Sequence, residues 1–136
     1  MARILCLDFG HVRIGVAISD QSRTIATSND YIAVKKGNVL QKIITIVSEN
    51  ECDEIVIGLP ISLNGNDTQK TVEVRKFADI LSKHFNIPIT LWDERLSSYT
   101  AENILKETNV RRDKRKGKRD SLSAQIILQG YLDSKK

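Results

Sequence analysis

The sequence predicts an α/β fold in which one mixed five-stranded sheet is flanked by helices. Two observations lead to it. Residues 4–7 are continuously apolar, and the predicted strand 54–59 is apolar after Glu54, which is typical of strands buried on both faces of a sheet. Later in the chain, segments with helical spacing alternate with strands, and such alternation implies parallel pairing through right-handed crossovers. The 136 residues suit one domain, 1–136, because domains commonly have roughly 100–200 residues.

The first three predicted strands follow one another too closely for crossovers, so we expect them to be antiparallel. The strand at 4–7 ends in a turn where Gly10 can adopt a positive φ. Residues 12–19 are alternating and β-compatible, and 24–34 give a weaker strand signal. These segments predict a hairpin and a third strand at the start of the sheet.

The rest of the chain alternates helix and strand. Asn38 is a candidate N-cap for a helix, and Asp67 or Thr68 for a second. A strand is predicted at 87–92, with Pro88 tolerated only near its start or on an edge. Ser97 or Ser98 is expected to begin a short helix, and Asp120 a final helix to about residue 132. The predicted apolar faces of the first two helices are Val39, Leu40, Ile43, Ile44 and Val47, and Val74, Phe77, Ala78, Leu81 and Phe85.

Composition excludes several classes of protein. No apolar run approaches the ~18 residues of a membrane helix, and the N-terminus does not have the pattern of a signal peptide. Cys6 and Cys52 give neither a disulfide framework nor a zinc knuckle. We therefore expect a cytoplasmic domain whose two cysteines are reduced thiols and which has no membrane partner.

The positive charge is concentrated in one segment. The chain has 21 Lys and Arg and 17 Asp and Glu, a net charge of +4. Residues 111–119, RRDKRKGKR, contain seven basic side chains and one acidic one. A segment of this kind indicates contact with a polyanion.

Acidic residues stand in three unusual contexts. Asp8 ends an apolar strand, Asp93 and Glu94 follow the strand 87–92, and Asp120 shares a helical face with buried-type residues. Each has an ordinary structural explanation: a turn former, a solvated strand end and a helix N-cap. Together they suggest a carboxylate cluster that binds Mg²⁺ or Mn²⁺, because parallel strands end on one edge of a sheet.

Four motifs resemble those of the YqgF family, a group of Holliday junction resolvases or pre-16S rRNA nucleases in the RNase H-like superfamily. They are DFGHVRIGVA at 8–17, GLP at 58–60 with Gly65, DERLS at 93–97, and GKRD at 117–120 with Ser123 and Ala124. The motifs come in the family's order and span nearly the whole chain. Two departures are Val12, where the family usually has Lys, and Ser123, where it usually has Ala.

The resemblance implies an RNase H-like fold and metal-dependent hydrolysis of phosphodiester bonds. Asp8, Glu94 and Asp120 match the catalytic carboxylates that hold two Mg²⁺ or Mn²⁺ ions. We also expect basic side chains to contact nucleic acid near them: Arg13, Arg95, Arg111, Arg112, Lys114, Arg115, Lys116, Lys118 and Arg119. Arg95 has an equally good structural role as the partner of Asp93.

The expected function is endonucleolytic processing of the 5′ end of pre-16S rRNA in ribosome biogenesis. Cleavage of branched DNA, as a Holliday junction resolvase, is the alternative, and a catalytically idle RNA-binding module is another. The opening DFG motif also resembles the phosphate loop of actin- and hexokinase-type ATP-binding proteins, but these clamp nucleotide between two domains. A homodimer is compatible with the sequence, which does not fix the oligomeric state.

Overall fold

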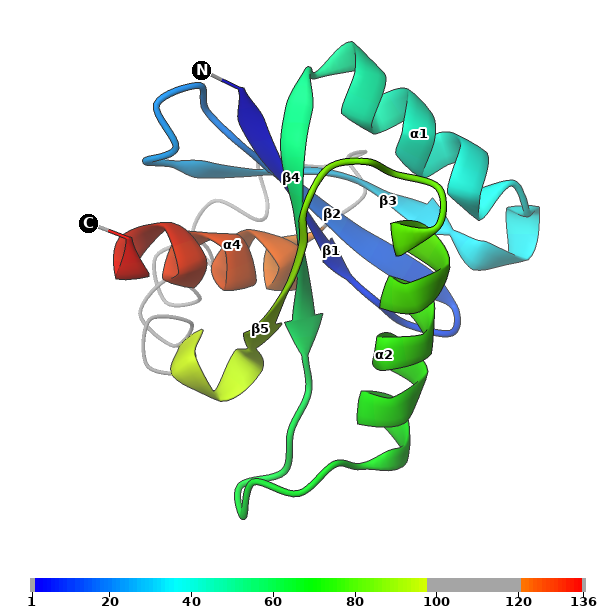
Figure 1. Cartoon of the computed structure of the whole chain (residues 1–136), viewed down its shortest axis with the longest axis vertical. Coiled ribbons are helices and arrows are strands. Elements are labelled where there is room, and N and C mark those ends of the chain that lie inside the picture. Colours follow the sequence, from blue (N-terminus) through cyan, green and yellow to red (C-terminus); the bar gives the residue numbers. More distant parts are fainter. Residues whose placement is uncertain (1, 98–120, 136) are drawn as a thin grey trace, which may run out of the picture.

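The computed structural model describes residues 2–97 and 121–135, which form one five-stranded sheet with helices on both faces (Figure 1). The strand order is β3-β2-β1-β4-β5. The strands are β1 (Arg3–Asp8), β2 (Arg13–Ser19), β3 (Ala26–Ala33), β4 (Cys52–Leu59) and β5 (Ile89–Asp93).

The pairing of the strands confirms the predicted mixed sheet. β1 pairs antiparallel with β2, and β2 pairs antiparallel with β3. β4 is parallel to both β1 and β5. Strands β1, β4 and β5 therefore end on one edge of the sheet, at Asp8, Leu59 and Asp93, which we call the carboxyl-end rim.

Two layers of side chains explain the continuously apolar strands. In β1, Leu5 and Leu7 pack on one face with helices α1 (Val39–Glu49) and α2 (Gln69–Ser82). Ile4 and Cys6 pack on the other face with α4 (Leu122–Ser134). Because side chains alternate along a strand, Asp8 belongs to the same face as Ile4 and Cys6, which α4 covers.

The second helix is fixed to the end of β4 at its first turn. Thr68 is its N-cap and forms a capping box with Thr71. Thr71 is fully buried, and its hydroxyl also donates to the carbonyl oxygen of Pro60. The start of α2 is thereby held next to the carboxyl-end rim. Its predicted apolar face is confirmed for Val74, Phe77, Ala78 and Leu81, whereas Phe85 lies beyond the end of the helix and packs on the same core.

Asn38 is the N-cap of α1, as predicted, but it adopts φ 57° and makes no capping bond with its side chain. Two other local expectations were wrong. In the same helix Ile46, not Ile44, joins the core cluster. Gly10 is not among the glycines with positive φ; a Cβ there would instead lie 2.6 Å from the carbonyl oxygen of Arg13.

The observed bounds of several strands and helices also differ from the predicted ones. β2 begins at Arg13, and β5 begins at Ile89 because Pro88 has no N–H for the ladder. A 3-10 turn, η2 (Glu94–Ser97), follows β5 directly, so the chain turns before the predicted helix start at 97 or 98. α4 begins at Leu122 after Ser121, not at Asp120. None of the helices in the described part of the chain is long and apolar enough to cross a membrane.

Candidate functional site

Two of the predicted carboxylates meet at the carboxyl-end rim. Asp8 ends β1, and Glu94 opens η2 immediately after β5. Their side chains are half-buried and hydrogen-bonded to each other. They come from strands separated by β4, so the parallel sheet itself brings them together.

Two glycines make room for this pair. A Cβ on Gly58, in β4 between the two strands, would lie 2.7 Å from Oε1 of Glu94 and 2.7 Å from Cδ1 of Ile127. Gly15 pairs with Asp8 across the hairpin, and a Cβ there would lie 3.3 Å from the Cβ of Asp8 and 3.4 Å from that of Ala124. Glycine at these positions lets Glu94 and the first turn of α4 approach the sheet closely.

Burial makes both carboxyl groups harder to ionise. It raises the pKa of Asp8, and the charge of Lys70 and the hydrogen bond with Glu94 offset part of that increase. Burial also raises the pKa of Glu94, and the negative charge of Asp8 raises it further. The shared hydrogen bond lowers the pKa of Asp8 and raises that of Glu94, so Glu94 keeps the proton and donates the hydrogen bond to Asp8.

Asp93 lies next to Glu94 in sequence but has a different partner. Its carboxylate accepts hydrogen bonds from Arg95 at 2.7 Å (Nη2) and 2.9 Å (backbone N). The hydrogen bond from the Arg95 side chain is the main cause of the lowered pKa of Asp93. Arg95 Nη1 also lies 3.4 Å from the carbonyl oxygen of Ser62. The structural pairing considered for Arg95 is therefore present, and its contact with nucleic acid stays a prediction.

A family model described as "RuvX: Holliday junction resolvase" matches residues 2–134, and the chain carries the paired rim carboxylates on a matching sheet. The chain belongs to the RuvX family. This confirms the resemblance given by the sequence motifs, since RuvX and YqgF denote the same family. Nuclease activity is the function for which this family is named.

Relatives match the chain over almost its entire length. A "Putative pre-16S rRNA nuclease" of Halothermothrix orenii is 42% identical over 132 residues, covering 96% of this chain and 94% of the relative. A protein of the same name from Bacillus pumilus is 41% identical over 135 residues, with 97% and 98% covered. The relatives that match this chain over nearly its whole length are thus named for the processing of rRNA.

Solved structures support the fold. RuvC of T. thermophilus, in complex with a Holliday junction substrate, has a TM-score of 0.66 at 10% identity and covers 99% of this chain and 96% of that chain. The yeast mitochondrial resolvase Ydc2 has a TM-score of 0.57 at 8% identity, with 96% and 78% covered. At these identities the likeness shows the fold alone, and it confirms the predicted RNase H-like sheet.

Lys70 is a site residue that sequence reasoning missed. It lies in the first turn of α2, one residue before the buried Thr71 that binds Pro60. Its charge lowers the pKa of both Asp8 and Glu94. The available signal was its position, because a basic residue in the first turn opposes the helix dipole and has no stabilising role there.

The remaining predicted residues are placed only in part. Arg13 is exposed at the start of β2, with its guanidinium carbon 5.3 Å from the ring centre of Tyr31. Asp120 and the basic side chains of the segment 111–119 lie outside the described residues. Within residues 2–97 and 121–135, no three Asp, Glu, His or Cys side chains gather as a metal-binding group. The third carboxylate therefore stays a prediction.

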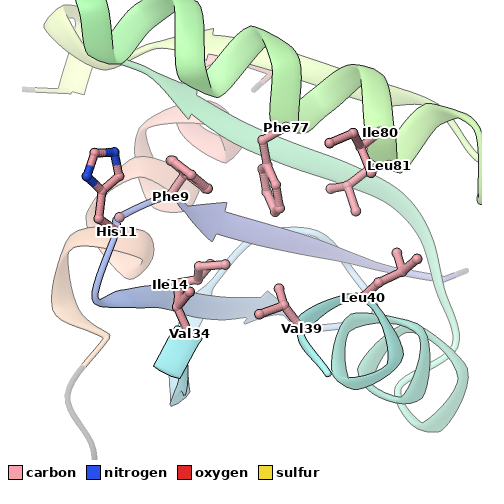
Figure 2. A pocket seen from close by; sticks show the side chains of 10 residues that line it. Phe9, His11, Ile14, Val34, Val39, Leu40, Phe77, Ile80 and Leu81 are labelled. Carbon is pink, nitrogen blue, oxygen red and sulfur yellow. The ribbon is translucent and has the colours of Figure 1, made fainter. Parts of the chain in front are cut away.

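An apolar groove of about 410 Å³ lies on the face of the sheet opposite the carboxylate pair (Figure 2). Phe9 and Phe77 line it with ring centres 4.8 Å apart. His11 lies at one end, where its Nε2 contacts the Glu73 carboxylate of α2. No carboxylate lines the groove, which separates it from the candidate site.

Proposed function

We propose that this RuvX-family protein is a metal-dependent endonuclease, with Asp8, Glu94 and Asp120 as its catalytic carboxylates. One observation carries the proposal. Asp8 and Glu94 are half-buried side by side, and neither forms an ion pair with any residue in 2–97 or 121–135. Like charges held this way are costly unless a cation or a proton neutralises them.

The donor set fits a hard divalent cation. Carboxylate oxygens at a partly hydrated rim suit Mg²⁺ or Mn²⁺ and would leave positions for water and phosphate. Asp8 and Glu94 would hold the metal from the sheet, and Asp120 from the chain just before α4. When bound, the metal activates the attacking water and stabilises the leaving oxygen of the phosphodiester.

The surrounding cations suit a phosphate backbone. Lys70 supplies positive charge at the carboxylate pair, and Arg13 and Arg95 extend it along the same rim. In the segment 111–119, Lys118 and Arg119 precede Asp120 directly and would hold phosphates near it. The other basic residues there would add salt-dependent affinity without reading sequence.

Pre-16S rRNA is the substrate we propose, with the protein acting in the cytoplasm on the 5′ end of the precursor. The support is the shared name of relatives that are about 40% identical over nearly the whole chain. Branched DNA is the second candidate, supported by the description of the family model and by the fold shared with a junction-bound RuvC. Both substrates would present phosphates to the same carboxylates.

The test compares a 5′-extended 16S rRNA precursor with a labelled four-way DNA junction, each incubated with the protein and Mg²⁺. We expect faster cleavage of the precursor and none by an Asp8→Asn variant. Faster cleavage of the junction would favour a resolvase. No Mg²⁺-dependent cleavage of either substrate would contradict the proposed nuclease function.

A further inference from the structure

A buried hydroxyl group without a hydrogen-bond partner lies at the start of α4. Ser121 is 3% exposed, and its Oγ makes no hydrogen bond with any residue in 2–97 or 121–135. Buried polar side-chain atoms in native proteins nearly always have a partner, so each exception needs an explanation. In the described part of the chain, the other buried side-chain nitrogen or oxygen without a partner is Oε1 of Gln125.

Ser121 occupies the N-cap position of α4, but its side chain does not cap the helix. Its backbone carbonyl accepts the hydrogen bond from the N–H of Gln125 at 3.1 Å. A serine at this position usually also accepts, with its side chain, a hydrogen bond from an N–H of the first turn. That bond is missing here. Helix capping therefore does not explain why a hydroxyl is buried at this position.

The first turn of α4 adjoins the carboxylate pair. A Cβ on Gly15 would lie 3.3 Å from the Cβ of Asp8 and 3.4 Å from that of Ala124. The helix also contacts η2, which begins with Glu94. Ser121 precedes Ala124 by three residues, so the two lie on the same side of the helix within one turn of each other. The hydroxyl of Ser121 is thus carried by the part of α4 that lies beside Asp8.

The burial and the charges around Ser121 indicate what its hydroxyl can bind. A side chain that is 3% exposed leaves no room for the phosphate of a nucleic acid, whereas a single water molecule is small enough. Asp8, Glu94 and the adjoining Asp120 are acidic, which also disfavours an anion. A water bound to a divalent cation is a strong hydrogen-bond donor, and Mg²⁺ in proteins usually keeps several waters. The hydroxyl oxygen of a serine can accept from such a water.

We propose that Ser121 is a positioning residue of the metal site, whose hydroxyl binds a water in the hydration shell of the cation held by the carboxylates. This inference rests on the proposed nuclease function and adds an uncharged group to its site. Ser121 would not contact the substrate. It would fix the orientation of one water, as groups that bond to the ligands of a metal commonly do.

A purely structural explanation competes with this one. Gln125 follows Ser121 by one helical turn, and its Nε2 lies 3.3 Å from the carbonyl oxygen of Ala26 at the edge strand β3. A permanently bound water between Ser121 Oγ and Gln125 Oε1 would satisfy both atoms without any metal. Removing the hydroxyl would then destabilise the metal-free protein, whereas the metal-site role predicts no such loss.

The test uses two variants that lack the hydroxyl, Ser121→Ala and Ser121→Gly. Glycine is the better N-cap residue of the two, so a shared effect cannot come from helix capping. Ser123→Ala is the matched control, because Ser123 is exposed in the first turn of the same helix. Melts in EDTA measure the stability of the metal-free protein. Calorimetric titration with Mn²⁺, without nucleic acid, measures metal affinity, and Asp8→Asn is titrated in parallel.

We expect Ser121→Ala to melt no lower than the native protein in EDTA, because a buried hydroxyl without a partner is removed. Both Ser121 variants should bind Mn²⁺ about tenfold more weakly, the lower end of the range for groups that orient metal ligands. Ser123→Ala should change neither the Tm nor the affinity. Asp8→Asn should bind Mn²⁺ much more weakly than any of these variants.

Unchanged Mn²⁺ affinity in the Ser121 variants would overturn the inference. A lower Tm of Ser121→Ala in EDTA would also overturn it and assign the hydroxyl to a structural water shared with Gln125. If Asp8→Asn loses Mn²⁺ binding while the Ser121 variants retain it, only the role of Ser121 is refuted. Native affinity in Asp8→Asn, or no Mn²⁺ binding by the native protein, would refute the carboxylate metal site and the proposed function with it.

Discussion

Carboxylates at the two ends of the sheet's strands have opposite environments and oppositely shifted pKa values. At the carboxyl-end rim, Asp8 and Glu94 are half-buried against each other, and burial is the main cause of the raised pKa of both. At the opposite edge, Asp20 accepts hydrogen bonds from the hydroxyl of Ser22 and from two backbone N–H groups, at 2.8 and 3.1 Å. These bonds lower the pKa of Asp20 to about 2. Asp20 thus has its hydrogen-bond partners within its own turn, whereas Asp8 and Glu94 are half-buried beside each other and form no ion pair with a residue in 2–97 or 121–135.

The largest effect should come from removing charge at the carboxyl-end rim. Asp8→Asn should lower Mg²⁺-dependent cleavage about 1000-fold or more, because the amide keeps the shape but no longer neutralises a metal. Without Mg²⁺ the variant should melt no lower than the native protein, since one of two repelling carboxylates is gone. Cleavage rates and thermal melts in EDTA measure both.

Asp20→Asn is the matched control for that substitution. It should leave cleavage within about twofold and lower the Tm, because an amide accepts the hydrogen bonds of the turn less well than a carboxylate. Cleavage by Asp8→Asn within a fewfold of the native rate would refute the assignment of this rim as the active site.

The second-largest effect should distinguish Glu94 from its neighbour Asp93 at the end of β5. Glu94→Gln should slow cleavage about 100-fold, whereas Asp93→Asn should cost at most about tenfold, because Asp93 serves Arg95 and not the carboxylate pair. Assaying the two variants together, with melts to check folding, decides the assignment. Loss confined to the Asp93 variant would reverse it.

A smaller effect is expected at Lys70. Lys70→Met removes the cation that lowers the pKa of Asp8 and Glu94, so the acidic limb of the pH–rate profile should move to higher pH. Cleavage at neutral pH should fall about three- to tenfold, within the range of a partly solvated charge contact. Lys76→Met, further along the same helix and exposed, is the control. Identical pH profiles for the two variants would mean that Lys70 is only a solvated surface residue.

The smallest effect is on the pH dependence of folding stability, to which Asp8 and Glu94 contribute with the opposite sign to Asp20. The raised pKa values of Asp8 and Glu94 mean that metal-free folded protein binds protons more tightly than the unfolded chain does. Their contribution should fall as pH rises from about 4 through the raised folded values. Asp20 has a folded pKa of about 2, so its contribution should be present above about pH 4 and lost as pH falls towards 2.

Melts in EDTA of the native protein and the Asp8→Asn and Asp20→Asn variants, across this pH range, test that contrast. The Tm of Asp8→Asn should gain on the native protein as pH rises. The deficit of Asp20→Asn should shrink as pH falls. Parallel curves for all three proteins would show that neither carboxylate has a perturbed pKa.

The sequence predicted the sheet because its evidence is local and repeated. Continuous apolar strands and the capped second helix are visible in short windows, and parallel strands necessarily end on one edge. The last rule also brings Asp8 to the strand end that carries Glu94. Predictions of local detail were wrong where a single residue decides the outcome. Pro88 has no N–H for the strand ladder, so β5 begins one residue later, and Asn38 adopts a left-handed backbone conformation without a capping hydrogen bond from its side chain.

The site was harder to predict because exposure and approach are properties of three dimensions. Lys70 looks like any solvated helical lysine until Thr71 fixes the start of α2 to Pro60. Asp120 and the segment 111–119 fall outside the described residues, so their roles stay predictions from the sequence.

The register of β1, β4 and β5 has a consequence for how this protein can diverge. Each rim loop begins from a strand whose pairing is fixed on the core side, and the strands come from separate stretches of the chain. A loop can therefore gain, lose or exchange residues without shifting the carboxylates supplied by the strand ends. Descendants of one ancestral chain can change which nucleic acid they accept one loop at a time, while the hydrolytic chemistry is inherited unaltered.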